Sequence, residues 1–78
     1  MPTVLRVDGF RFFFYSNDSG EPPHVHVEKG GASGKWWLDP VAMVWEDGFT
    51  RPQLRRVDTI IRANQGRLLE AWHEHFPG

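Results

Sequence analysis

The chain has 78 residues, no cysteine and a formal net charge of -1, and it contains four Trp, six Phe and one Tyr. This length supports a single domain over residues 1–78, and the lack of cysteine excludes disulfides and thiolate metal sites, so stability must come from aromatic packing or from a second chain. We expect a soluble cytoplasmic protein with no membrane segment, because no apolar run approaches the ~20 residues that a membrane span needs.

A β-hairpin is predicted for residues 3–15, because Asp8-Gly9 tolerates the positive φ angles of a two-residue turn between two β-prone runs. The turn sets a register in which the following residues are opposite each other: Val7 and Phe10, Arg6 and Arg11, Leu5 and Phe12, Val4 and Phe13. One face of this hairpin is apolar and should face the core, and it consists of Leu5, Val7, Phe10, Phe12 and Phe14.

Residues 16–23 are predicted to form a loop, followed by a strand over 24–28, a Gly-rich turn at 30–34 and a strand around 35–38. The apolar run at 41–45 is too short to classify, and it fits a helical turn or a fifth strand. Four antiparallel strands in a meander are the simplest arrangement.

An amphipathic helix is predicted from Thr50 to about Phe76. The segment Thr50-Arg51-Pro52-Gln53 fits a capping box with Pro in the first turn. An apolar stripe at helical spacing follows, formed by Leu54, Val57, Ile61, Leu68 and Trp72. The segment at 64–66, which contains Gly66, fits a kink, but we expect one continuous helix across one face of the sheet.

Residues 22–28, Pro-Pro-His-Val-His-Val-Glu, are the most informative segment. In a strand, alternation places His24, His26 and Glu28 on one side and both valines on the other. This polar side belongs to the sheet face without the helix, together with Val4, Arg6, Arg11, Phe13 and Tyr15 of the hairpin. Arg6 opposite Arg11 is an unfavourable like-charge pair unless a carboxylate or an external anion lies between them, and Glu28 is the internal candidate.

Several roles for the two histidines remain open. His24, His26 and Glu28 are suitable ligands for Zn²⁺ or Mn²⁺ with an open fourth position. Alternatively, His24 or His26 is a general base acting on a ribose hydroxyl while Arg6 and Arg11 neutralise the phosphate, as a metal-free ribonuclease requires. A non-catalytic anion or partner site, or hydrogen bonds to loop carbonyls, would need no chemistry at all.

The chain also resembles a small bacterial family, domain-of-unknown-function family number four-one-six-zero. The resemblance is carried by residues 1–6 (MPTVLR), 9–16 (GFRFFFYS), 21–28 (EPPHVHVE), 38–41 (LDPV) and 68–72 (LLEAW). It implies one half of a two-gene unit, beside a second small family of unknown function, number two-four-four-two, in an arrangement similar to a toxin and antitoxin pair. The chain departs from the family pattern at Trp45-Glu46-Asp47.

We therefore predict an α+β domain with a four-stranded antiparallel meander and one long C-terminal helix packed on one face. The functional hypothesis is a component of a toxin-antitoxin-like module that binds RNA or phosphate through Arg6, Arg11, Phe13 and Tyr15, and that uses His24 and His26 as catalytic groups without a cofactor. One alternative is a protein-interaction module in which Phe13, Tyr15 and Trp37 bind a second copy or a small protein encoded nearby. The other is a metal-binding domain through His24, His26 and Glu28.

Overall fold

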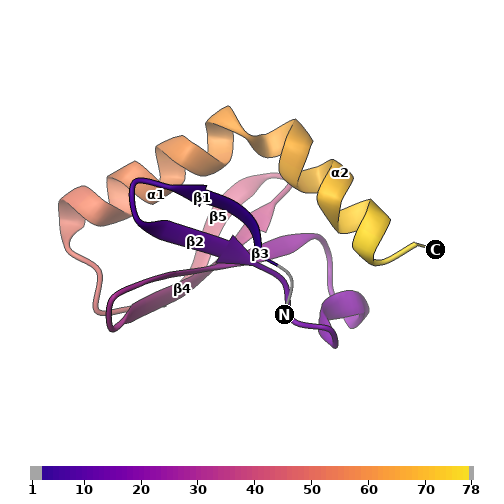
Figure 1. The fold of residues 1–78 in the computed structure, drawn as a ribbon, viewed down its shortest axis with the longest axis horizontal. Helices are drawn as coiled ribbons and strands as arrows, with labels where there is room; N and C mark the ends of the chain where they lie inside the picture. Colours follow the sequence, from indigo (N-terminus) through magenta and orange to yellow (C-terminus); the bar gives the residue numbers. More distant parts are fainter. Residues whose placement is uncertain (1–2, 78) are drawn as a thin grey trace.

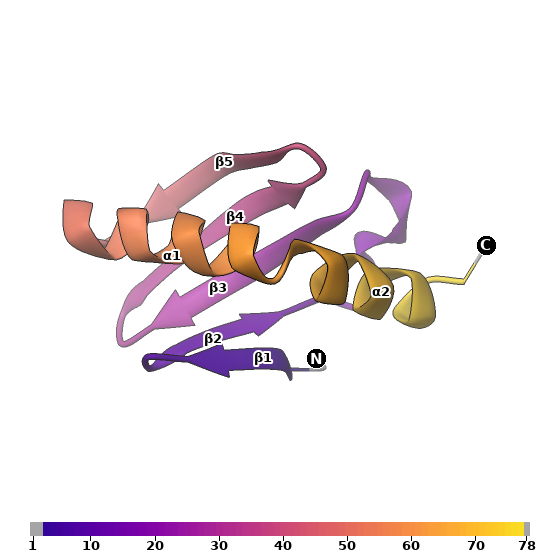
Figure 2. The same cartoon turned by 90° about the horizontal axis from the view of Figure 1, so that it is seen from above.

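The computed structural model describes residues 3–77 as an antiparallel sheet covered on one face by two helices (Figures 1 and 2). The elements in chain order are β1 (Thr3–Val7), β2 (Phe10–Phe13), the 3-10 turn η1 (Asp18–Gly20), β3 (His24–Lys29), β4 (Ala32–Leu38), β5 (Val41–Asp47), α1 (Arg51–Ala63) and α2 (Gln65–His75). The strands lie in the order of the sequence, each antiparallel to the next. The α+β class and the meander are therefore as predicted.

The β1–β2 hairpin turns at Asp8 and Gly9, whose φ angles of 52° and 81° are those of the predicted two-residue turn. The register next to the turn is also as predicted, with Arg6 opposite Arg11. Further from the turn the prediction was wrong, because an irregularity between Thr3 and Leu5 leaves Thr3, and not Val4, opposite Phe13. An extra residue of this kind shifts the pairing without changing the turn.

The predicted number of strands was wrong, because residues 41–47 form β5 at the edge of the sheet. This strand pairs with β4 through a connection of only Asp39 and Pro40. Its burial pattern does not alternate, because only its first residue, Val41, is buried in the core, while residues 42–45 at the edge of the sheet are exposed. Pairing with β4, which a short apolar run does not reveal, decides its structure.

The single long helix was also wrong, because the helical segment is interrupted at Asn64. The Asn64 side chain donates to the carbonyl oxygen of Ile60 at 2.8 Å, which closes the end of α1. Gln65, the first residue of α2, donates from Nε2 to the carbonyl oxygen of Leu38 at 2.8 Å and so ties α2 to the end of β4. The predicted capping box is present, since Thr50 Oγ1 accepts from the Gln53 amide and Gln53 Oε1 accepts from the Thr50 amide.

The core lies between the sheet and the two helices. Phe12, Phe14, Trp36 and Leu38 are almost completely buried on the sheet side. Val57, Ile60, Ile61, Leu68 and Trp72 face them from the helices. Each such side chain contributes roughly 1.5–3 kcal/mol through its burial, which is how a short chain without disulfides forms a stable core. Among residues 3–77, neither helix is long and apolar enough to span a membrane.

Candidate metal centre

The strand β3 places its histidines on the side away from Val25 and Val27, as the alternation predicted, but the His24 ring, at the start of the strand, also packs against Trp72 of α2. Val25 and Val27 are fully buried in the core, while His26 is opposite Phe13 of β2 and Lys35 of β4 on the other face. This face was expected to be open at the histidines and at Phe13, and that expectation was wrong. His24 is completely buried and Phe13 is only 3% exposed. The aromatic neighbours and the loop between β2 and β3 account for this burial.

Asp18 in this loop lies against both histidines. Its Oδ1 is 3.1 Å from Nε2 of His24, and its Oδ2 is 3.4 Å from Nε2 of His26. The loop holds the carboxylate in place, because the Tyr15 amide donates to Asp18 Oδ2 at 2.8 Å and the Asp18 amide donates to the Tyr15 carbonyl oxygen at 3.2 Å. One ligand atom from each of Asp18, His24 and His26 can be chosen so that all three lie within 4.8 Å of one another.

The contact of Nδ1 with a backbone carbonyl determines the tautomer of the neutral His24 ring. Nδ1 lies 2.9 Å from the carbonyl oxygen of Pro22, which can only accept, so Nδ1 carries the proton. In the neutral ring, Nε2 then has a lone pair and lies 3.1 Å from Asp18 Oδ1. The Nε2 atoms of His24 and His26 are both buried and without a hydrogen bond among the described residues. A buried imidazole lone pair close to a carboxylate is unfavourable unless a proton or a cation compensates it.

Aromatic rings enclose the two imidazoles. Phe13 stacks on His26 at 5.7 Å between ring centroids, and Tyr15 meets the same ring edge-on at 4.6 Å. Trp37 and Trp72 lie 5.7 and 5.0 Å from the His24 ring. Burial lowers the pKa of His26 below its ordinary value, although the Asp18 carboxylate acts in the opposite direction. The lowered pKa favours the neutral imidazole, which is the form that binds metals.

Glu28, the third metal ligand suggested by the spacing, lies in a different contact. Its Oε1 accepts from Nη1 of Arg11 at 2.7 Å, as expected for the group that compensates the Arg6 and Arg11 pair. Arg11 also donates from Nε to Oγ1 of Thr3 at 2.8 Å and lies over the Phe13 ring at 4.3 Å. Arg6 and Tyr15 are exposed. The structure thus brings Asp18 to the histidines, and Glu28 to Arg11.

Asp18 was missed in the sequence because its loop was identified by composition alone. The signal that could have found it is a carboxylate six residues before His24, in a connection short enough to fold back onto the strand. Glu21 of the same loop lies 3.7 Å from Nδ1 of His24. It is ion-paired with Lys35, which lowers its pKa and keeps it charged.

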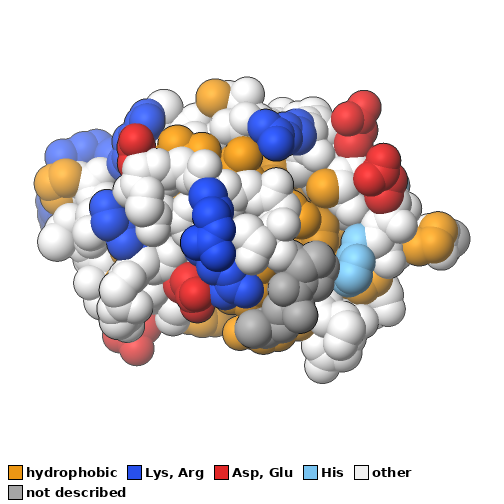
Figure 3. All heavy atoms as spheres, viewed as in Figure 1, with side chains coloured by type: hydrophobic (Ala, Val, Ile, Leu, Met, Phe, Trp, Pro, Cys, Tyr) orange, Lys and Arg blue, Asp and Glu red, His pale blue; other side chains and the backbone are white. Residues whose placement is uncertain are grey.

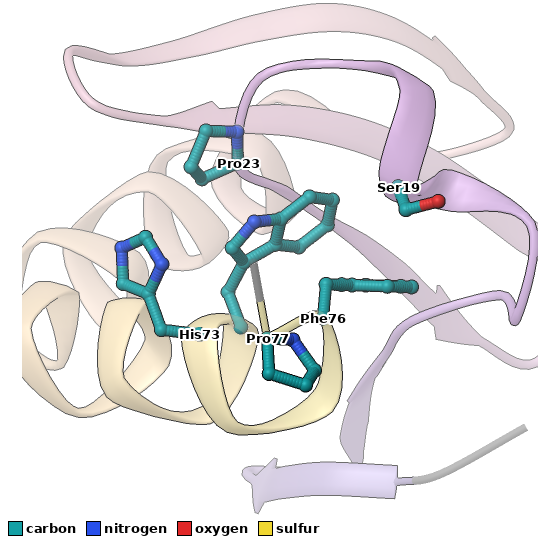
Figure 4. A pocket seen from close by; sticks show the side chains of 6 residues that line it. Ser19, Pro23, His73, Phe76 and Pro77 are labelled. Carbon is teal, nitrogen blue, oxygen red and sulfur yellow. The ribbon is translucent and has the colours of Figure 1, made fainter.

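A separate pocket of about 570 Å³ lies beside the cluster, between the loop and the end of α2 (Figure 4). Its lining is mixed, with Pro23, Phe76, Pro77 and Trp72 as apolar members and Ser19 and His73 as polar members. Trp72 contacts both places, since it lines the pocket and packs against His24. The pocket brings no second acid or base beside His73, so the Asp18, His24 and His26 cluster is the stronger candidate site.

Fold and site together define a two-layer α+β domain with a buried cluster of two histidines and one aspartate. Comparison with protein families matches residues 9–73 to the model described as Domain of unknown function (DUF4160). The match spans most of the chain, so the protein belongs to this family, as its sequence motifs predicted. Comparison with curated proteins and with solved structures found no match.

Proposed function

We propose that the protein is a small metal-binding domain in which Asp18, His24 and His26 hold a divalent transition metal ion. The observation that carries this proposal is the pair of buried, unpartnered Nε2 atoms beside one carboxylate. His24 also has the orientation typical of a metal ligand, with its other ring nitrogen fixed by a backbone carbonyl.

Two of the ligand distances are close to those of a zinc site. Two ligand atoms at ~2.0–2.1 Å from a tetrahedral ion are about 3.3 Å apart. Nε2 of His24 lies 3.1 Å from Asp18 Oδ1, Nε2 of His26 lies 3.4 Å from Asp18 Oδ2, and one ligand atom from each residue can be chosen so that all three lie within 4.8 Å of one another. Two imidazoles and one carboxylate favour Zn²⁺ over Mg²⁺, which prefers oxygen ligands, and three protein ligands leave one position of a tetrahedral ion open.

Titration calorimetry of metal-free protein, purified without an affinity tag, tests the site with Zn²⁺ as the probe. We expect one zinc ion per chain, and strongly weakened binding in Asp18→Asn and in His26→Ala. The matched control is Glu28→Gln, which removes the carboxylate paired with Arg11 and should leave zinc binding unchanged. Circular dichroism confirms that each variant is folded. A parent protein that binds no zinc contradicts the proposal, and loss of binding only in Glu28→Gln would assign the site to the other carboxylate.

A second candidate function is binding of single-stranded RNA at the β1–β2 hairpin, as part of a toxin-antitoxin-like two-gene module. The observation that favours it is a basic and aromatic strip. Lys and Arg side chains gather over this hairpin (Figure 3), and Arg6 and Tyr15 are exposed there. Cleavage by His24 has less support than binding, because a general base must reach the substrate hydroxyl and His24 is completely buried.

If the hairpin binds RNA, the affinity for a short single-stranded RNA should fall as the salt concentration rises. Arg6→Ala should reduce the slope of log affinity against log salt concentration by about one, the value for one lost phosphate contact. Arg67→Ala on α2, also exposed, is the matched control and should keep the parent slope. An unchanged slope in Arg6→Ala contradicts a role for this strip. Co-expression with the neighbouring gene, scored for growth arrest and rescue, tests the two-gene module independently.

A further inference from the structure

The outer edge of β5 is the most apolar exposed strand of the protein. Met43, Val44 and Trp45 are 50%, 39% and 45% exposed, and they follow one another along an edge that has no strand beyond it (Figure 2). Edge strands of stable monomers normally carry Lys, Pro or covering segments, because the free backbone groups of an edge pair readily with another strand. Residues 42–45 of β5 include neither Lys nor Pro, and the register irregularity at Val44 is the feature of this edge that limits pairing.

The pattern along β5 is symmetric about Val44. The register with β4 shifts there, so that Val41, Ala42 and Met43 pair on one side of it and Trp45, Glu46 and Asp47 pair on the other. In an antiparallel pair of β5 strands related by a two-fold axis near Val44, each half meets the opposite half of the second copy. Trp45 of one copy then lies beside Met43 of the other, which is a favourable aromatic and thioether contact.

Charges complement each other in the same arrangement. Asp47 is exposed, at the end of β5, and makes no ion pair with the other described residues. At the opposite end, Arg62 of α1 donates from Nη2 to the carbonyl oxygen of Val41 at 3.3 Å. Its Nε is paired with Asp58 Oδ2 at 2.7 Å, and the side chain remains 60% exposed, so its guanidinium can also meet a second carboxylate. Antiparallel pairing therefore places Asp47 of each copy next to Arg62 of the other, and the two-fold axis repeats this contact.

We infer that the occupant of this edge is a second copy of the same chain, joined through β5 into a continuous sheet across the two-fold axis. The interface differs from the expected one through Phe13, Tyr15 and Trp37, because Phe13 is already buried within the chain. One strand edge buries less than the ~1,200–2,000 Å² of standard stable interfaces, so we expect a weak, reversible dimer. The inference is independent of the metal site.

Sedimentation velocity of the full chain over a wide concentration range tests it, in the presence of a chelator so that metal cannot join the chains. We expect a reversible monomer and dimer equilibrium. Asp47→Lys and Arg62→Glu each place two like-charge contacts in the symmetric interface and should weaken the dimer roughly tenfold. An equimolar mixture of these two variants should recover the dimer, because the mixed pair has an attractive contact at both ends.

Matched controls are Glu74→Lys and Arg67→Glu, which make the same charge changes at exposed positions of α2 and should leave the dimer unchanged. Thermal melts establish that every variant is folded. A parent protein that stays monomeric at all concentrations overturns the inference. So does a dimer that both β5-directed variants retain, or a mixture that fails to recover it, since another surface or another partner would then be involved.

Discussion

At the scale of single residues, Gly34 is a position where only glycine fits. A Cβ at this position would lie 2.6 Å from Cζ3 of Trp36 and 3.1 Å from the backbone oxygen of Trp45. Trp36 is almost fully buried in the core, and the Trp45 backbone belongs to the neighbouring strand. The glycine at position 34 therefore leaves space for the indole of Trp36, two residues further along β4.

Gly34→Ala should lower the free energy of unfolding by about 1–3 kcal/mol, because it overpacks the core beside Trp36. Urea denaturation measures this loss. Gly31→Ala is the matched control, since nothing lies within 4 Å of a Cβ there, and it should change stability by less than about 0.5 kcal/mol. Equal stability of the two variants would contradict the close packing at Gly34.

At the scale of elements, the ends of the helices depend on a few polar side chains. The N-terminus of α1 is closed by the reciprocal bonds of Thr50 and Gln53. The break between α1 and α2 depends on Asn64 and on the bond from Gln65 to Leu38. Gly66 is exposed in the first turn of α2 and has open space around it, so the break does not require a glycine at this position.

Thr50→Ala should cost about 1 kcal/mol of stability, because it leaves an amide of the first turn without its capping acceptor. Combining it with Gln53→Ala in a double-mutant cycle measures how far the two bonds depend on each other. Additive losses would show that the two halves of the capping box act independently, against our expectation.

Gly66→Ala should raise the free energy of unfolding by roughly 0.5–1 kcal/mol, because alanine loses less backbone entropy in a helix and meets no neighbouring atom. Its helical content should remain that of the parent, measured by circular dichroism. A destabilised variant would indicate that Gly66 is needed for the break after all.

At the scale of the whole molecule, the loop between β2 and β3 is held against the start of β3 and the end of β4, beside the C-terminal end of α2. Its contacts are the Asp18 and histidine cluster, the ion pair of Glu21 with Lys35, and the bond from the Leu38 amide to the Pro23 carbonyl oxygen at 3.0 Å. The chain has no cysteine and so no disulfide, and a metal ion bound by Asp18, His24 and His26 would cross-link this loop to β3.

Zinc should therefore stabilise the whole fold. At a free zinc concentration of 100 times Kd the gain is about 2.7 kcal/mol. For a domain of this size, such a gain corresponds to a rise in Tm of roughly 10 to 20 °C. Differential scanning calorimetry with zinc, with Mg²⁺ and with a chelator measures it. Asp18→Asn should lose the zinc-dependent rise while Glu28→Gln keeps it, and an unchanged Tm of the parent with zinc would contradict the metal site.

The sequence by itself determined the features that depend on neighbours along the chain. These are the turn at Asp8 and Gly9, the alternation that separates His24 and His26 from Val25 and Val27, the capping box at Thr50, and the family. Each rests on backbone preferences or on a period that is visible within a few residues.

Only the tertiary structure decided which distant groups meet. The run at 41–47 became a strand because β4 offers it hydrogen bonds, and the helix broke where Gln65 reaches Leu38. The candidate metal centre was predicted to include the two histidines but not Asp18, because a loop carboxylate joins a strand only through the path of the folded chain. Glu28 shares the strand face of the histidines, but it pairs with Arg11. This arginine is directly opposite Glu28 on the neighbouring strand β2, and their side chains lie 2.7 Å apart.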